Sequence, residues 1–260
     1  MPTPIVLLLD PISLGVFLLY AGLMIWERLR PARKLPTVKG WRMRGLLSFA
    51  LFFFLSSYLP ILWDAKLAEY QLLDLSELGT AAGALVGLLV YEGLLYLWHR
   101  SLHESGFLFR GFHQVHHSAE RVDTFGAFYF SPLDMAGFTF VGSLSLALFV
   151  GLSADAITVF LFATLFLGIF QHANIATPRW LGFLIQRPES HALHHARGVH
   201  YYNFSDLPIF DMLGGTFKNP RQFPSETGFY HGASNRMVDM LLWRDVTEED
   251  GHKLETSQAV

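Results

Sequence analysis

The chain has 260 residues, of which 52% are hydrophobic and 16% are charged, with a formal net charge of −3 and no cysteine. A mean hydropathy of +0.33 is too apolar for an ordinary soluble domain and predicts one integral membrane domain over residues 1–260, without internal repeats. The missing cysteines exclude disulfide bonds and cysteine-ligated iron–sulfur clusters, and the small net charge predicts no nucleic-acid partner.

Three apolar segments precede the first cluster of histidines. Residues 1–26 have no basic amino-terminal region and no small-residue cleavage site, so we expect a retained helix rather than a signal peptide, with Asp10 and Pro11 at a first turn or cap. Residues 45–63 carry no charge and are long enough for a second span. Residues 79–98 form the third, interrupted only by Glu92.

A polar stretch over residues 100–134 is followed by a longer apolar run over residues 135–171, which is broken at residues 151–155. Each half has about 16 residues, or about 24 Å of helix, whereas the hydrocarbon core of a bilayer is roughly 30 Å thick. The run is therefore a thin transmembrane pair or a re-entrant hairpin, and in either form the chain returns to the same side. The sequence thus predicts an all-α membrane protein with four to five membrane helices.

The loops between these segments predict the orientation. Residues 28–44 contain seven basic residues and no acid, whereas residues 64–78 contain four acids against Lys66. Because basic loops stay in the cytoplasm, the histidines described next are expected in a helical cap on the cytoplasmic face. The membrane is then a plasma or inner membrane, or that of the endoplasmic reticulum.

Nine histidines lie close together in three short boxes and one single position. The boxes HRSLH, HQVHH and HALHH supply His99 and His103, then His113, His116 and His117, then His191, His194 and His195, and His172 lies between the last two boxes. If these segments are helical, spacings of three and four residues place the imidazoles of each box on one helical face. Nine imidazoles exceed the four ligands of a tetrahedral zinc ion and suit a site for two metals. Imidazole binds iron, zinc and copper, so the ligand type alone does not name the metal.

The third span is predicted to continue as a helix from residue 79 through His103, over about 37 Å. Glu92, Tyr96, His99 and His103 then fall on one stripe of that helix. Because a carboxylate is costly in lipid, Glu92 is expected to face the interior of the bundle. There it orients a ligand, lines the path of a substrate, or simply bonds a neighbouring helix.

The order of the boxes and two flanking motifs resemble the fatty acid hydroxylase/sterol desaturase superfamily of membrane di-iron oxygenases. The run YEGLLYLWHRSLH at residues 91–103 is similar to the opening motif of that family, with Glu92 where Asp is usual and Leu97 where Trp is usual. NFSDLPIFDMLGGTF at residues 203–217 resembles its closing motif. The resemblance covers roughly residues 88–218, and a polar tail is expected over residues 225–260.

This resemblance implies two iron ions on the nine histidines, dioxygen as co-substrate, and zinc as a substitute in purified protein. The implied reaction is hydroxylation of a C–H bond in a membrane lipid: a fatty acyl chain, a sterol, a carotenoid or an ether lipid. Desaturation stays open, because both reactions begin with the same hydrogen abstraction. The chain has no flavin, nicotinamide or haem-domain motif, so a separate ferredoxin- or cytochrome-type electron donor is expected.

Ligating imidazoles usually donate their second N–H to a carboxylate or a carbonyl. The acids beside the boxes or within the closing motif are Glu104, Glu189, Asp206 and Asp211. Among them Glu104 and Asp206, together with Glu92, are the candidate catalytic acids, and the alternative for each is a helix cap or a surface charge. Some lipid-cleaving relatives carry Glu at the position of Glu104.

The remaining polar positions are weaker candidates. His200 is a possible ligand or a hydrogen-bond partner of one, Asn203 bonds a ligand or closes a turn, and His231 and His252 are expected in solvent. Residues 125–134 are the candidate wall of a lipid tunnel, and residues 178–188 form an amphipathic interfacial segment.

The rival hypothesis is a transporter or sensor that binds metal without redox chemistry. Such a protein needs polar ligands near the middle of the bilayer, on a path that joins both faces.

Overall fold

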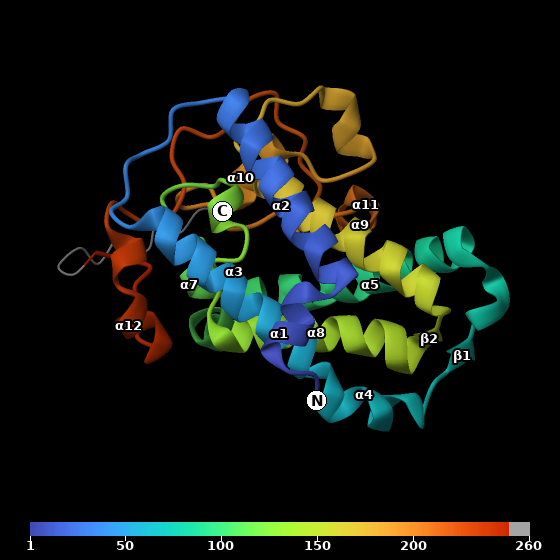
Figure 1. The fold of residues 1–260 in the computed structure, drawn as a ribbon. Helices are drawn as coiled ribbons and strands as arrows, with labels where there is room; N and C mark the ends of the chain where they lie inside the picture. The colour runs from blue at the N-terminus through green and yellow to red at the C-terminus, as the bar shows by residue number, and fades with distance from the viewer. Residues whose placement is uncertain (250–260) are drawn as a thin grey trace.

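The computed structural model describes residues 1–249 and is built almost entirely of helices (Figure 1). The longest elements are α2 (Pro11–Leu29), α3 (Trp41–Tyr58) with α4 (Pro60–Ala68), α5 (Thr80–Glu104), α8 (Pro132–Ser143) with the π-helical η4 (Leu144–Phe149), and α9 (Ala154–His172). Five helices in the described residues are long and apolar enough to cross a membrane. The prediction of an all-α membrane protein is therefore confirmed.

The predicted first span is divided into two helices, α1 (Pro4–Leu9) and α2. Pro11 has no backbone N–H to continue the hydrogen-bond ladder. The Asp10 carboxylate instead accepts hydrogen bonds from the amides of Ile12 at 2.9 Å and Ser13 at 3.4 Å. The predicted cap is confirmed, and the apolar helix that follows it ends three residues later than expected, at Leu29.

Small residues let α5 and α9 lie against each other. A Cβ atom on Gly83 would lie 3.0 Å from Cβ of Ala156, and one on Gly87 would lie 2.7 Å from Cδ1 of Leu152. Close backbone approach at small residues is the usual basis of helix packing in membranes. Since these contacts fall near the first residues of both helices, α5 and α9 run in the same direction and end together.

The second apolar run forms two helices rather than a shallow loop. Its membrane segments have 18 and 19 residues, about 27 and 28 Å at 1.5 Å per residue. They are joined at β2 (Val150–Gly151), which pairs in parallel with β1 (Leu73–Asp74). Because β1 and η1 (Ser76–Leu78) directly precede α5, the tip of the pair reaches the start of α5. Both helices are long and apolar enough to cross a membrane, and their connection lies beside the start of α5.

The other end of the bundle carries a cap of short helices. These are α6 (Gly106–Leu108), the π-helical η2 (Phe109–His113), α7 (Gln114–His117), η3 (Thr124–Gly126), η5 (Arg179–Phe183), α10 (Pro188–His194), α11 (Pro208–Gly214), η6 (Ala233–Asn235) and α12 (Met237–Leu241). In η5, Trp180 and Phe183 expose 63% and 55% of their surface, which suits the predicted interfacial segment. His231 is exposed as expected.

Residues from 225 onward are not a free polar tail as far as the structure describes them. Phe229, Met240 and Val246 are buried in one cluster with Trp41 and Val115. Isolated apolar residues in a polar stretch thus anchor this segment onto α7 and the start of α3. His252 and the last part of the predicted tail lie outside the described residues.

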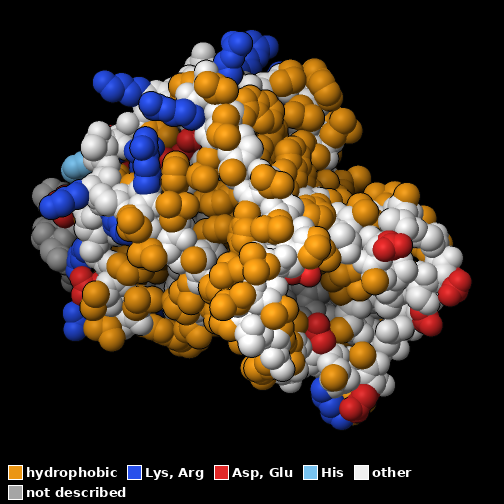
Figure 2. All heavy atoms as spheres, in the orientation of Figure 1, with side chains coloured by type: hydrophobic (Ala, Val, Ile, Leu, Met, Phe, Trp, Pro, Cys, Tyr) orange, Lys and Arg blue, Asp and Glu red, His pale blue; other side chains and the backbone are white. Residues whose placement is uncertain are grey.

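On the face drawn in Figure 2, most basic and most acidic side chains gather in different places. Figure 2 shows Lys and Arg gathered around the end of α2 and the start of α3, whereas most acids in this view lie near α4 and the segment before α5. A broad hydrophobic surface separates the two groups. The distribution agrees with the loop charges used above, and the cytoplasmic placement of the cap stays a prediction.

Gly45 in α3 provides a test of this packing, because a Cβ atom there would overlap the carbonyl oxygen of Phe125. Gly45→Ala should destabilise the protein by about 1–3 kcal/mol through overpacking. The control is Gly22→Ala in α2, which has open space around it and should be neutral or slightly stabilising, by up to about 1 kcal/mol. Thermal unfolding in detergent, followed by tryptophan fluorescence, measures both. Equal melting temperatures would contradict the packing of α3 against residues 124–126.

Candidate metal centre

Helix ends bring the predicted ligands to one end of the bundle. The last turns of α5 carry His99 and His103, which confirms the predicted continuation of that helix, and α9 ends at His172. The second box passes from the π-helical turn η2 into α7, and the third lies on α10 with His195 as its C-cap. A π-helical turn re-aims side chains and is frequent at functional sites.

The nine histidines fall into two groups, each able to hold one metal ion. The first group contains His99, His103, His113, His117 and His194, and the second contains His116, His172, His191 and His195. Within each group the ligand nitrogens lie within 4.8 Å of one another. The groups are neighbours, since the rings of His117 and His195 stack with centroids 4.2 Å apart. The prediction of two metal sites from nine imidazoles agrees with this division.

The nitrogen–nitrogen distances suit a shared ion. In the second group, Nε2 of His172 lies 3.1 Å from Nε2 of His116 and 3.0 Å from Nε2 of His191, which lies 3.1 Å from Nε2 of His195. Nε2 of His99 and of His113 in the first group are 3.0 Å apart. Two nitrogens bound side by side at about 2.1 Å from one ion are separated by about 3 Å.

Buried ring nitrogens without hydrogen-bond partners also indicate a site for a cation. Nε2 of His103, His117 and His194 in the first group is shielded from water and has no hydrogen-bond partner within residues 1–249. Buried polar atoms are almost always paired in native proteins. A cation bound between the rings would supply the missing partner, and the carboxyl ends of α5 and α9 would favour its charge.

Burial keeps these rings in the form that binds metal. Burial lowers the pKa of His116, His191 and His195 well below the usual range, and the charges of neighbouring histidines lower it further. The imidazoles are therefore neutral at pH 7. Neutral imidazole is the species that coordinates a metal ion.

In four of the nine histidines a backbone carbonyl or an acid holds the second ring nitrogen, whereas Nδ1 of His116, His191 and His195 has no hydrogen-bond partner in the described residues. Nδ1–H donates to the carbonyls of Phe204 from His99 (2.7 Å), of Gly168 from His172 (2.6 Å) and of Tyr202 from His194 (2.8 Å). The acid is Asp134 in the first turn of α8, whose Oδ2 accepts from Nδ1 of His113 at 2.6 Å. Our sequence analysis missed this role. The sequence does carry one sign of this role, because Asp134 is an isolated acid directly before the apolar run over residues 135–171.

His200 lies behind a ligand and belongs to neither group. Its Nδ1 is 3.0 Å from Nδ1 of His117, so one ring donates to the other and fixes its tautomer. Burial lowers the pKa of His200 to about 4. Of the two predicted roles, hydrogen-bond partner fits this position.

The three candidate catalytic acids do not contact the histidines in the described residues. Glu92 is buried as predicted, and its Oε2 accepts hydrogen bonds from Oγ of Ser205 and the amide of Asp206, both at 2.9 Å, and from the amide of Leu207 at 3.1 Å. Asp206 accepts from Gln171 at 2.6 Å, and burial raises the pKa of Asp206.

Glu104 lies away from the metal groups. Its side chain is 51% exposed and pairs with Arg100 at 2.6 Å. Glu104 directly follows His103 in the sequence, but consecutive residues of a helix do not face the same way.

The other predicted acids hold loops around the site. Asp211 accepts from the amides of Phe204 at 2.8 Å and Ser205 at 3.0 Å. Glu189 accepts from the amide and the hydroxyl of Thr177 at 2.8 and 2.7 Å. Asn203, with a left-handed φ of 56°, donates to the carbonyl of Ser190 at 2.9 Å. A strained loop is thus fixed from several sides, and it carries two of the carbonyls that orient histidines.

Comparison with known proteins agrees with this geometry. The profile of the Fatty acid hydroxylase family matches residues 84–216, which hold all nine ligands of the two groups. The chain is 32% identical over 149 residues to "Ornithine lipid hydroxylase OlsE" of Rhizobium tropici, covering 55% of this chain and 43% of that protein. It is 30% identical over 159 residues to "Sphinganine C4-monooxygenase 2" of Arabidopsis thaliana, covering 59% and 60%.

A third relative is the "Alkylglycerol monooxygenase" of Caenorhabditis elegans, 30% identical over 131 residues, or 49% of this chain and 25% of that protein. The matches thus span between a quarter and three fifths of these relatives. No solved structure matches the chain. Since the family profile covers just over half of its length and includes every box, this membrane protein belongs to the fatty acid hydroxylase family.

Proposed function

We propose that the chain is a di-iron, dioxygen-dependent hydroxylase that oxidises a C–H bond of a membrane lipid. The observation that carries this proposal is the pair of adjacent, buried, all-imidazole groups at the end of apolar helices. When bound, two iron ions would supply the electrons and the site for activating dioxygen. Iron is the metal of the family, while zinc would bind the same ligands in purified protein.

Aromatic residues beside the histidines would receive the alkyl chain of the lipid. The Phe130 ring centroid lies 4.2 Å from that of His116, and the Phe138 centroid lies 6.0 Å from those of His99 and His113. Phe130 belongs to the predicted tunnel segment, and Phe138 follows on α8. An apolar wall at this place would align a chain entering from the bilayer and exclude water from the reacting centre.

The names of these relatives favour hydroxylation of a lipid with a long alkyl chain. Ornithine lipid, sphinganine and alkylglycerol differ in their polar parts. Another relative is a "Very-long-chain aldehyde decarbonylase GL1-1" of rice, 30% identical over 179 residues, or 61% of this chain and 25% of that protein. Desaturation is the second candidate reaction. A separate ferredoxin- or cytochrome-type protein would deliver electrons at the cytoplasmic face.

The rival transporter hypothesis lacks support in the described residues. The two groups that could hold a metal lie at one end of the helices, whereas transport needs ligands along a path between both faces. Glu92, which lies well inside the span formed by α5, is engaged by a loop of the cap.

Replacing one ligand tests the proposal directly. His116→Ala should reduce the bound metal by about one ion per chain, because it removes one of four ligands from the second group, and should abolish product formation. Elemental analysis measures the metal, and untargeted lipid mass spectrometry of expressing cells seeks a species heavier by one oxygen atom. His231→Ala, at an exposed position, is the control.

A lipid species lacking two hydrogens, in place of one heavier by an oxygen atom, would indicate a desaturase. If the wild-type protein binds metal yet consumes no dioxygen with reductant and lipid extract, the result would favour the transporter or sensor hypothesis.

Asp134→Asn tests the acid that holds His113. The asparagine has nearly the same shape but no charge, so we expect metal affinity or turnover to fall about 10- to 100-fold. Metal titration of the stripped protein gives the affinity. Asp155→Asn, at the exposed start of α9, should leave it unchanged. Equal affinities for wild type and Asp134→Asn would refute the assigned role.

Glu92→Gln tests whether the Glu92 carboxylate holds the closing motif at residues 203–217 in place. We expect the metal to stay bound and kcat to fall about tenfold, in the range found for groups behind metal ligands, because three donors converge on one carboxylate oxygen. Glu104→Gln is the matched control and should keep nearly normal turnover. If both variants are equally impaired, the distinction between these acids is wrong.

A further inference from the structure

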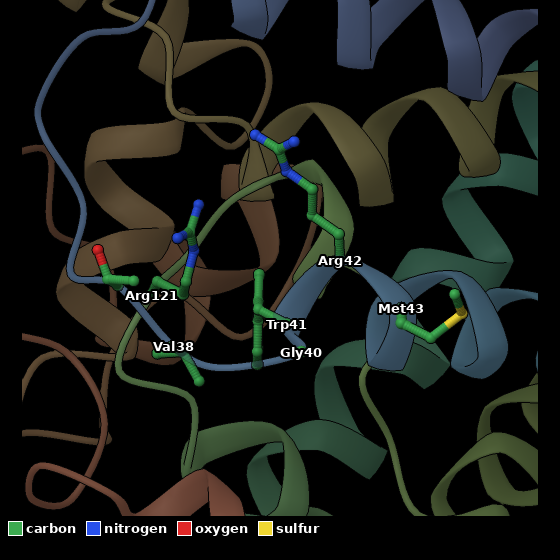
Figure 3. Close-up of a pocket in the computed structure, with 7 residues that line it drawn as sticks. Val38, Gly40, Trp41, Arg42, Met43 and Arg121 are labelled. Carbon is green, nitrogen blue, oxygen red and sulfur yellow. The ribbon is translucent and has the colours of Figure 1, made fainter.

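Two adjoining cavities lie where α2 ends and α3 begins, and neither is lined by a histidine. Their volumes are about 530 and 450 Å³, and both are lined by Arg42 and Arg121. Figure 3 shows the smaller cavity, in which these two side chains extend to the same side of the segment from Val38 to Trp41. The side chains of Arg42 and Arg121 therefore form part of the wall of both cavities.

The larger cavity has a strong excess of positive charge. Its cationic lining consists of Arg28, Arg33, Lys34, Arg42 and Arg121, and Glu27 is the acid among its lining residues. Oε2 of Glu27 already accepts from the amides of Thr124 at 2.8 Å and Asn174 at 3.1 Å. Arg121 is paired with Asp123 at 2.6 Å. Residues 1–249 provide no ion pair to an acidic side chain for the other four cations.

Arg33 presents a free pair of donors. Its Nη1 donates to the carbonyl of Pro224 at 2.7 Å, and its guanidinium lies 4.6 Å from the ring centroid of Phe223. Nε and Nη2 are shielded from water and have no partner in the described residues. These two N–H groups form the edge that binds two oxygens of one phosphate or carboxylate. Arg33 is half-buried, and its two shielded N–H groups lack the partner that buried polar groups usually have.

The apolar side chains around the cavities indicate that the anion belongs to a lipid. Apolar side chains on the outer faces of the two helices are exposed beside the cavities: Ile25 by 59%, Leu29 by 71%, Met43 by 62% and Leu47 by 62%. Figure 2 shows the basic side chains directly next to this hydrophobic surface. Lipid phosphates lie at this boundary, and basic pockets between membrane helices bind anionic headgroups.

We propose that these cavities bind the phosphate of an anionic membrane phospholipid, whose acyl chains lie along α2 and α3. Arg28, Lys34 and Arg42 attract the phosphate, and the two-donor edge of Arg33 binds it once the atoms that cover Nε and Nη2 move aside. Asn174, which follows the ligand His172 by two positions, also lines the larger cavity. A bound lipid would therefore brace the 28–44 loop against a segment that leads from the metal centre.

The test uses purified full-length protein titrated with dioleoylphosphatidylglycerol and followed by native mass spectrometry. The triple variant Arg28→Gln, Lys34→Gln, Arg42→Gln should weaken binding at least tenfold. The control Arg30→Gln, Lys39→Gln, Arg221→Gln removes the same charge from positions that line neither cavity, and should change binding less than twofold. Arg33→Lys, which keeps the charge but loses the two-donor edge, should weaken binding at least fivefold. Melting temperature and metal content report that each variant is folded.

Other ligands give outcomes that separate the alternatives. Dioleoylglycerol, which lacks the phosphate, should show no saturable binding, and inorganic phosphate should fail to displace the phospholipid. Equal weakening in both triple variants would mean general surface attraction and overturn the site. Full displacement by inorganic phosphate would replace the lipid with a free anion. A plant-type ferredoxin serves as an acidic protein probe. If the cavity triple variant binds lipid normally but loses salt-sensitive binding to this ferredoxin, the basic face would be assigned to a protein partner.

Discussion

The close packing of neutral imidazoles is the constraint on which the structure depends. A single pair of ring nitrogens 3.0–3.1 Å apart can share one proton in a hydrogen bond, but Nε2 of His172 and Nε2 of His191 each lie at this distance from two other ring nitrogens. Because a ring nitrogen carries either one proton or one lone pair, these contacts cannot all be hydrogen bonds. A cation between the rings would satisfy all of them, provided that every ring turns its lone pair inward. Contacts of Nδ1 with Asp134, with His200 and with the carbonyls of Phe204 and Tyr202 fix the tautomers of four rings in the first group. In the second group the carbonyl of Gly168 does so for His172, whereas Nδ1 of His116, His191 and His195 has no hydrogen-bond partner in the described residues.

The closing motif is best understood through those carbonyls. Its residues are not ligands, yet the carbonyl of Phe204 and the preceding Tyr202 orient histidines from two different boxes. The backbone there is strained, with a φ of 67° at Tyr202 and 56° at Asn203, and such a conformation persists only when its surroundings hold it. Glu92 accepts hydrogen bonds from Ser205 to Leu207, and Asp211 accepts from Phe204 and Ser205, so both carboxylates hold the residues that directly follow the strained pair. A carboxylate inside a membrane helix thus stabilises a loop of the cap.

The features that local patterns determine could be predicted from the sequence. Apolar length defined the spans, and helical spacing placed the boxes. Asp134 was missed because it lies 21 residues from its partner His113, and no periodicity connects them. The anchoring of residues 229–246 likewise depends on distant contacts with Trp41 and Val115. Glu104 shows the converse: adjacency in sequence suggested a role, but a helix turns consecutive residues about 100° apart, so its side chain faces Arg100 instead.

The two metal groups are unequal, and this has a chemical consequence. The first group offers five imidazole nitrogens and the second offers four, so a metal held by the second group would have one protein ligand fewer. The ring centroid of Phe130 lies 4.2 Å from that of His116 in the second group, whereas that of Phe138 lies 6.0 Å from those of His99 and His113 in the first. The aromatic wall therefore borders both groups. A lipid chain lying on Phe130 would come closest to the group with fewer protein ligands.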